Sequence, residues 1–162
     1  MATPYDAQHS QTLSRIYHYA DKYGIDREKG VKQLWQESRF KINAVSPVGA
    51  KGIAQFMPTT AQEWGVNTSD LESSLDGWGR YMRWLLDRPK IAGDYAKALA
   101  AYNWGIGNVE RKGLAKLPAE TANYLDTILG KNWRTAAKYS LGLGTILVLG
   151  FATYFLYKNI NA

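Results

Sequence analysis

Glu37 is the residue of this sequence best suited to acid and base chemistry. It follows the apolar residues Leu34 and Trp35, so its carboxyl group can lie in partly apolar surroundings. A carboxyl group in such surroundings keeps its proton to higher pH, which lets it act first as a general acid and then as a general base. A glutamate on a helix is nevertheless most often a solvated surface residue. The neighbouring motifs therefore have to decide between the two interpretations.

Three short motifs follow one another along the chain. They are Glu37-Ser38, then Ser46 with Gly52-Ile53-Ala54-Gln55-Phe56-Met57-Pro58, and then Ala101-Tyr102-Asn103-Trp104-Gly105. This ordered set resembles the lytic transglycosylase family of lysozyme-like enzymes. The likeness extends from residue 10 to about residue 129 and includes the pattern of Pro118, Glu120 and Tyr124. Each motif alone is weak evidence, whereas their order along the chain is strong evidence.

The resemblance implies that Glu37 is the catalytic acid/base. In that family a single glutamate protonates the β-1,4 bond between N-acetylmuramic acid and N-acetylglucosamine in peptidoglycan, while the N-acetyl group supports the positive charge at the anomeric carbon. The ionised glutamate then takes the proton of the C6 hydroxyl, which attacks intramolecularly and leaves a 1,6-anhydro end. An ordinary glycosidase uses two carboxylates. The resemblance implies one carboxylate, no cofactor and no metal.

The resemblance also assigns binding roles to residues around the predicted catalytic glutamate. The predicted substrate-binding residues are Ser46, Gln55, Tyr102, Asn103, Glu120 and Tyr124. Ser38 and Trp104 are further candidates, because Ser38 either supports the helix end or touches substrate, and Trp104 either packs or stacks on a sugar ring. The sequence departs from the commoner family pattern at Ala54, where methionine is frequent, and at Trp104, where a small residue is frequent. These departures concern the shape of the subsites.

Three alternatives to this function remain open. A true peptidoglycan hydrolase, or muramidase, would need a second carboxylate, for which the candidates are Glu63, Asp70, Glu72 and Asp76. A non-catalytic murein-binding membrane protein would hold glycan in the same groove without cleaving it. A pore-forming or holin-like protein is a third interpretation, suggested by the apolar C-terminal segment.

Apolar periodicity predicts a mainly helical domain. Apolar residues recur at helical spacing in residues 10–24, in residues 27–38 after the predicted N-cap Asp26, and in residues 58–64, 75–85, 95–102 and 119–130. Residues 41–58 have no sustained period and contain several glycines and prolines, so they predict a structured loop or short strands. Within this loop Gly52 is interpreted as a position of unusual dihedral angles or close backbone approach.

Composition excludes several classes of protein and site. The 162 residues have no cysteine and two histidines, which rules out disulfides and thiolate metal sites. Twenty Lys and Arg against fourteen Asp and Glu give a net charge of +6, which favours an anionic partner such as the cell-wall polymer. The basic residues are dispersed, so nucleic-acid binding is not expected.

The C-terminal segment predicts a membrane anchor. Residues 139–157 contain no charge, and nineteen residues at about 1.5 Å each span roughly 28 Å, close to the hydrocarbon thickness of a bilayer. The predicted organisation is a lysozyme-like lytic transglycosylase domain (1–130), a basic juxtamembrane linker (131–138), a transmembrane helix in the bilayer (139–157) and a short tail (158–162). Glycines in the predicted span would permit pairing into a homo-oligomer.

The charges that flank this segment predict a topology. Lys131, Arg134 and Lys138 precede the segment and Lys158 follows it, which places the enzymatic domain on the cytoplasmic side. The N-terminus has no signal-peptide pattern. A membrane-containing phage that packages the enzyme in its virion membrane, and uses it to open the wall during entry, would reconcile this topology with a murein substrate. The alternative is a bacterial inner-membrane enzyme whose domain faces the periplasm.

Overall fold

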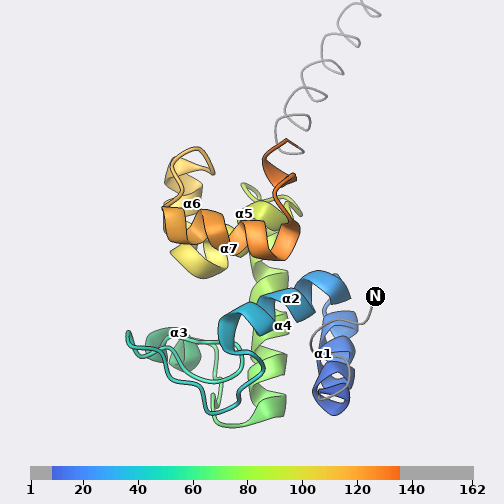
Figure 1. The fold of residues 1–162 in the computed structure, drawn as a ribbon. Coiled ribbons are helices and arrows are strands. Elements are labelled where there is room, and N and C mark those ends of the chain that lie inside the picture. The colour runs from blue at the N-terminus through green and yellow to red at the C-terminus, as the bar shows by residue number, and fades with distance from the viewer. Residues whose placement is uncertain (1–8, 136–162) are drawn as a thin grey trace, which may run out of the picture.

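Seven helices make up the regular structure of residues 9–135, the part of the chain that the computed structural model describes (Figure 1). They are α1 (Ser10–Lys22), α2 (Arg27–Ser38), α3 (Pro58–Glu63), α4 (Leu71–Asp87), α5 (Tyr95–Trp104), α6 (Ile106–Lys112) and α7 (Ala119–Leu129). The loop of residues 39–57 has two isolated bridges, Val45 with Lys51 and Lys51 with Phe56, and the described residues form no strand beyond these. The predicted mainly helical fold is confirmed.

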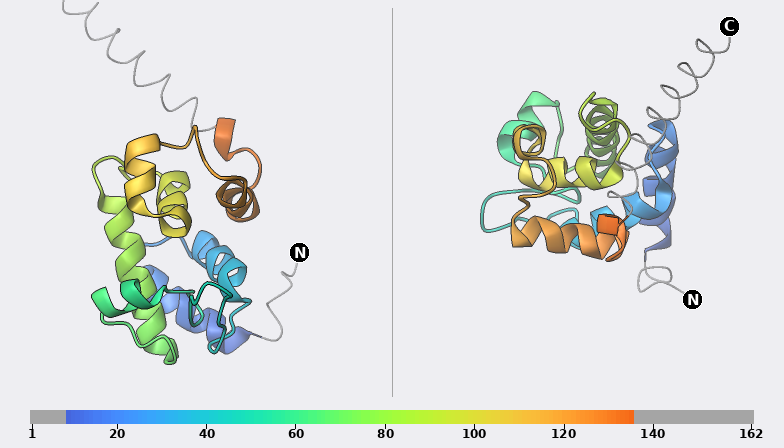
Figure 2. Two further views of the ribbon diagram at one scale, coloured as in Figure 1. Left: turned by 90° about the vertical axis from the view of Figure 1, so that its left-hand side faces the viewer. Right: turned by 90° about the horizontal axis from the view of Figure 1, so that it is seen from above.

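Helix α4 is the centre of the packing. Its residues Leu75, Trp78, Met82 and Leu85 are fully buried and lie on one face at helical spacing. In Figures 1 and 2, α1, α2 and α3 lie beside the earlier part of α4, while α5, α6 and α7 gather at its C-terminal end. Contacts between α2 and α7 join the two groups of helices. Helix α2, which carries Glu37, therefore packs against α1 of the first group and α7 of the second.

Local sequence explains where α2 begins and ends. Asp26 accepts a hydrogen bond from the backbone N–H of Lys29 at 3.0 Å, which confirms the predicted N-cap. Directly after Ser38 the residues Arg39 and Phe40 have positive φ angles of 56° and 61°. Such angles are costly for residues other than glycine and end the helix abruptly. Glu37 thus lies in the last turn of α2.

Gly52 fixes the path of the loop that follows α2. Its φ is +78°, and a Cβ atom at this position would collide with the carbonyl oxygen of Thr68. Both the dihedral angle and the close approach require glycine. This confirms the interpretation of Gly52 from the sequence.

Helix α6 was not predicted. It begins directly after Gly105, whose φ of +91° turns the chain sharply between α5 and α6. Val109 is its one buried residue, so the segment carries little of the apolar periodicity by which a helix is recognised.

The predicted localisation requires a correction. Within residues 9–135 no helix has the length and apolar character needed to cross a membrane. The predicted span of residues 139–157, with its bilayer contact and its pairing into an oligomer, lies outside the described residues. The residues that the structure describes thus contain no spanning helix for a single-pass location in a virion membrane or a bacterial inner membrane, which contradicts the predicted localisation.

Candidate active site

A pocket of about 290 Å³ lies where the end of α2 faces α7 and the end of α5. Its lining residues are Gln36, Glu37, Asn103, Glu120, Asn123, Tyr124 and Thr127. Four of these were predicted as site residues: Glu37, Asn103, Glu120 and Tyr124. Residues that are far apart in the sequence therefore meet in one pocket.

The Glu37 carboxyl group is the titrating centre of this pocket. The Tyr124 hydroxyl donates a hydrogen bond to its Oε1 at 2.5 Å. Burial raises the pKa of Glu37 to about 7, although the hydrogen bond from Tyr124 acts in the opposite direction. At neutral pH a large fraction of the Glu37 side chains carries a proton. This group can therefore donate a proton and accept one in the same pH range.

Tyr102 on α5 lies close to the same carboxyl group. Burial and then the negative charge of Glu37 raise the pKa of Tyr102 well above its ordinary value. Its hydroxyl donates a hydrogen bond to the carbonyl oxygen of Ala54 at 2.7 Å. Tyr102 thus joins α5 to the loop of residues 39–57 next to Glu37, and it does not line the pocket itself.

Asn103 and Glu120 lie on the α5 and α7 sides of the pocket. The Oδ1 atom of Asn103 accepts a hydrogen bond from the Thr121 hydroxyl at 2.8 Å. This bond fixes the orientation of the amide and leaves its NH₂ group as the part that can donate to a ligand. Glu120 is exposed at the start of α7.

Ser46 and Gln55 lie in the loop of residues 39–57 and are not brought into the pocket. The Ser46 hydroxyl accepts a hydrogen bond from the backbone N–H of Ala50 at 3.0 Å. The Gln55 amide donates to the carbonyl oxygen of Gly52 at 2.9 Å, and Gln55 has a positive φ of 50°. In this structure both side chains hold the loop in shape. Their predicted contacts with sugar stay predictions.

The two further candidates also have structural partners. The buried Ser38 hydroxyl donates to the carbonyl oxygen of Ile53 at 2.8 Å and so attaches the end of α2 to the loop. Trp104 is partly buried, and the ammonium group of Lys112 lies 5.0 Å from the centre of its indole ring. The predicted stacking of Trp104 on a sugar stays a prediction.

The carboxylates that were candidates for a second catalytic group do not line the Glu37 pocket. Three of the four are held by other groups: Asp70 by the backbone N–H of Ser73, Glu72 by the Tyr19 hydroxyl, and Asp76 by Lys22, Tyr23 and Arg80. The remaining candidate, Glu63, ends α3. Residues 9–135 also contain no cluster of histidine and carboxylate side chains that could hold a metal ion.

Three pocket residues were not identified from the sequence: Gln36, Asn123 and Thr127. A signal for the last two exists, because Asn123 and Thr127 follow Glu120 by three and seven residues and so share one face of α7 with it. Gln36 precedes Glu37 and lies at the same end of α2. Helical periodicity, applied to polar residues as well as apolar ones, would have found the α7 pair.

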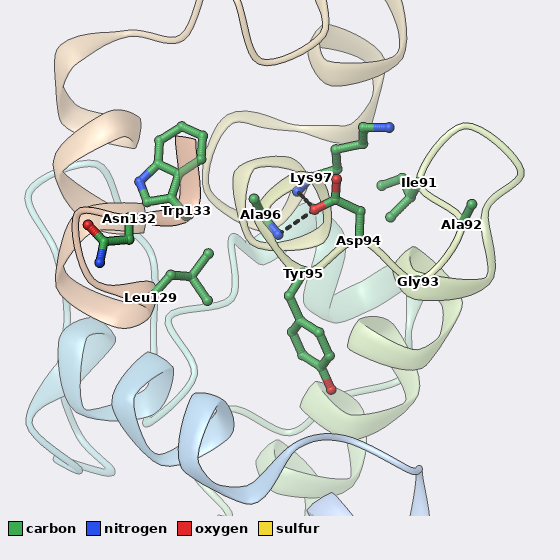
Figure 3. Close-up of a pocket in the computed structure, with 10 residues that line it drawn as sticks. All are labelled: Ile91, Ala92, Gly93, Asp94, Tyr95, Ala96, Lys97, Leu129, Asn132 and Trp133. Carbon is green, nitrogen blue, oxygen red and sulfur yellow. Dashed lines mark hydrogen bonds between the residues drawn. The ribbon is translucent and has the colours of Figure 1, made fainter. Parts of the chain in front are cut away.

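A larger pocket of about 670 Å³ lies at the start of α5 (Figure 3). The Asp94 carboxylate in this pocket already accepts hydrogen bonds from the backbone N–H groups of Ala96 and Lys97, so it caps α5. The Tyr95 hydroxyl accepts a hydrogen bond from the backbone N–H of Asp26 at 2.6 Å. None of the predicted site residues lines this pocket. The smaller pocket is the candidate active site because it contains the titrating Glu37.

This chain matches a family model and is similar to several known proteins. Residues 14–125 match the model of the transglycosylase SLT domain. The membrane-bound lytic murein transglycosylase F of Marinobacter nauticus is 32% identical over 142 residues, which cover 78% of this chain and 28% of that protein. The protein of the same name from Shewanella woodyi is 37% identical over 101 residues, which cover 59% of this chain and 21% of that protein.

A solved structure supports the fold. The X-ray structure of an inactive mutant of the lytic transglycosylase Slt from Pseudomonas aeruginosa superposes with a TM-score of 0.53 at 24% identity. The superposition covers 81% of this chain and 22% of that chain. The present chain thus matches less than a third of the length of each of these relatives.

Proposed function

Because this chain belongs to the transglycosylase SLT domain family, we propose that it cleaves the glycan strands of peptidoglycan as a lytic transglycosylase. The observation that carries the proposal is the Glu37 carboxyl group, which lies in a pocket with a pKa raised to about 7 by burial. A glycosidic oxygen is a poor leaving group until it is protonated, so the reaction needs an acid that keeps its proton at neutral pH.

In the proposed mechanism Glu37 acts twice. Protonated Glu37 donates its proton to the oxygen of the β-1,4 bond between N-acetylmuramic acid and N-acetylglucosamine, and that bond breaks. Ionised Glu37 then accepts the proton of the C6 hydroxyl of the muramic acid, and the C6 oxygen bonds to the anomeric carbon. The proton gained in the second step replaces the proton lost in the first, so the enzyme is regenerated. No water is consumed.

The hydrogen bond from Tyr124 supports both steps of this proposal. It is present at 2.5 Å to one carboxyl oxygen of Glu37, which leaves the other oxygen for the proton that is transferred. When Glu37 ionises, a hydrogen bond to a charged acceptor becomes stronger. Tyr124 would therefore limit the cost of the ionised intermediate state. We propose Asn103 and Glu120 as groups that orient the glycan, because both line the pocket.

Analysis of the products tests this proposal. Purified murein is incubated with the protein, and the soluble fragments are examined by mass spectrometry. We expect muropeptides that end in 1,6-anhydro-N-acetylmuramic acid, each lighter by one water than a hydrolysed fragment. Glu37→Gln is the matched control and should release neither kind of end. Fragments with borohydride-reducible ends, and no anhydro ends, would contradict the transglycosylase mechanism.

Hydrolysis of peptidoglycan is the second candidate function, and the position of Glu120 favours it. Glu120 lines the same pocket as Glu37, so the pocket contains two carboxylates, as hydrolysis by an ordinary glycosidase requires. The two mechanisms differ in the effect of Glu120→Gln. A hydrolase would lose activity by orders of magnitude, whereas the proposed transglycosylase would retain anhydro product formation. The role in phage entry stays a prediction from the sequence.

A further inference from the structure

Thr121 has a buried hydroxyl group beside the candidate active site. The residue is 2% exposed, lies in the first turn of α7 and does not line the Glu37 pocket. A buried hydroxyl costs free energy unless it forms a hydrogen bond, whereas a valine side chain has a similar shape without that cost. The partner of the Thr121 hydroxyl therefore indicates what this group does.

The amide of Asn103 is that partner. The Thr121 hydroxyl donates to Oδ1 of Asn103 at 2.8 Å, and this is the only hydrogen bond of the hydroxyl within residues 9–135. If the amide were turned over, its NH₂ group would face Thr121, and the hydroxyl proton would be buried without an acceptor. Oδ1 of Asn103 therefore faces Thr121. The NH₂ group of Asn103, which lines the pocket, is left to donate into it.

The other amides of the pocket are not fixed in this way. The side chains of Gln36 and Asn123 also line the pocket, but within the described part of the chain their amides form no hydrogen bond. Each can turn either its oxygen or its NH₂ group to a ligand. Glu120, when ionised, can only accept. Asn103 is thus the amide in this pocket whose donor has a fixed direction.

We propose that Thr121 is a positioning residue, which holds the Asn103 amide so that its NH₂ group donates a hydrogen bond to a carbonyl oxygen of the glycan. A carbonyl oxygen can only accept, so it requires such a donor. The glycan has carbonyl oxygens in its N-acetyl groups and in the lactyl group of muramic acid. The inference rests on the proposed function for the identity of the ligand, whereas the hydrogen bond between Thr121 and Asn103 is present without ligand.

NMR of the full chain without glycan tests the positioning itself. Thr121→Val removes the hydroxyl and keeps the branched shape, and Thr121→Ala is a second hydroxyl-free variant in case the first fails to fold. We expect the order parameter of the ¹⁵N-labelled Asn103 NH₂ group to fall from about 0.85 to below about 0.6 without the hydroxyl, and to stay high in Thr121→Ser. Ser74→Ala is the matched control. It removes a buried hydroxyl that donates to the carbonyl oxygen of Asn67, outside the pocket, and should leave the Asn103 amide unchanged.

Binding of glycan tests the consequence. In the Glu37→Gln background cleavage is prevented, so calorimetry measures the dissociation constant of soluble strands of N-acetylglucosamine and N-acetylmuramic acid. We expect Thr121→Val to weaken binding about fivefold, the effect of one ordinary hydrogen bond, and to cause no further loss in the Asn103→Ala background. Tetra-N-acetylchitotetraose has N-acetyl groups but no lactyl group. An equal loss with this probe would identify the N-acetyl carbonyl as the acceptor, and a loss only with murein strands would identify the lactyl group.

Three results would overturn the inference. They are an unchanged Asn103 order parameter in the folded hydroxyl-free variants, an unchanged affinity for murein strands, and a loss of affinity from Thr121→Val that persists in the Asn103→Ala background. Failure of the proposed function would be seen separately. The wild-type protein would then release no muropeptides, while the Asn103 order parameter would still respond to Thr121→Val.

Discussion

Glu37 and Asp76 form two comparable sites with opposite behaviour. Each carboxylate lies on a helix, is shielded from water in part, and accepts a hydrogen bond from a tyrosine hydroxyl at 2.5 Å, from Tyr124 and Tyr23 respectively. The contribution of burial is to raise the pKa in both cases. The net result differs, because the pKa of Glu37 is raised to about 7 whereas the pKa of Asp76 is lowered to about 2.

The difference between the two sites is a pair of cations. Lys22 and Arg80 donate hydrogen bonds to Asp76 at 2.7 and 2.9 Å, and these bonds outweigh the effect of burial. Among residues 9–135, only burial and the Tyr124 hydroxyl shift the pKa of Glu37. A tyrosine hydroxyl is therefore insufficient to keep a buried carboxyl group ionised, and the lack of a nearby cation lets Glu37 hold a proton at neutral pH.

The largest expected effect is on catalysis. Glu37→Gln preserves the volume of the side chain but removes its titrating proton, so the rate of murein cleavage should fall by about a thousandfold or more. Asp76→Asn makes the same chemical change at the comparison site and should leave the rate within about threefold of wild type. Rates come from the release of soluble muropeptides. Equal losses in both variants would remove the distinction between the two carboxylates.

The second effect is on stability and depends on pH. Folded Glu37 holds its proton up to about pH 7, but the unfolded chain loses it near 4.5, so the native state loses stability as pH rises between these values. Glu37→Gln escapes this loss. Its free energy of unfolding relative to wild type should be higher at pH 8 than at pH 4, by up to roughly 3 kcal/mol. Urea unfolding at both pH values measures the difference, and a difference that does not change with pH would contradict the raised pKa.

The third effect is on stability at Asp76, where the dependence on pH has the opposite direction. Its folded pKa of about 2 lies below its ordinary value of 3.8, so the contribution to stability is complete above pH 4 and is lost as pH falls through 2. Asp76→Asn should unfold more easily at pH 7 by roughly 1–2 kcal/mol, after allowance for partial exposure. The difference in free energy of unfolding between the variant and wild type should disappear in urea titrations near pH 2. A difference that persists there would show that packing, rather than charge, stabilises this site.

The smallest effect comes from making the Glu37 site resemble the Asp76 site. Thr127 is exposed and lines the pocket, so Thr127→Lys places a cation beside Glu37. The cation should lower the pKa of Glu37 and move the alkaline limb of the pH–rate profile down by about one pH unit. Thr127→Gln is a neutral control of similar length and should leave the limb in place. An unmoved limb in a folded Thr127→Lys variant would argue that the carboxyl group is insensitive to nearby charge.

Much of the fold follows from the sequence because apolar residues at helical spacing mark the buried faces. The buried residues of α1 recur at helical spacing, as do Leu75, Trp78, Met82 and Leu85 of α4, and Asp26 caps α2 as expected. The loop of residues 39–57 could be predicted only as irregular. Its shape depends on individual contacts, such as the passage of Gly52 beside Thr68, and these have no signature in composition or period.

The site, like the fold, could be predicted from the sequence only in part. The ordered motifs indicated Glu37 and Tyr124, but they could not indicate that the two side chains share a hydrogen bond. No sequence pattern indicated that Gln33 is buried in the core, since a lone glutamine on a helix is usually exposed. Its burial depends on the Trp78 indole from α4, forty-five residues further along the chain. Such a pair becomes visible only when the helices are packed.

The hydrogen bond between Tyr124 and Glu37 joins residues 87 positions apart, which has a consequence for the order of events during synthesis. The ribosome completes Glu37, the loop of residues 39–57 and the central helix α4 long before α7 emerges. Until α7 packs against α2, Glu37 lacks its hydrogen bond from Tyr124 and the side of the pocket that α7 provides. The pocket around Glu37 is therefore complete only after the last of the seven helices of the described residues has been synthesised and packed.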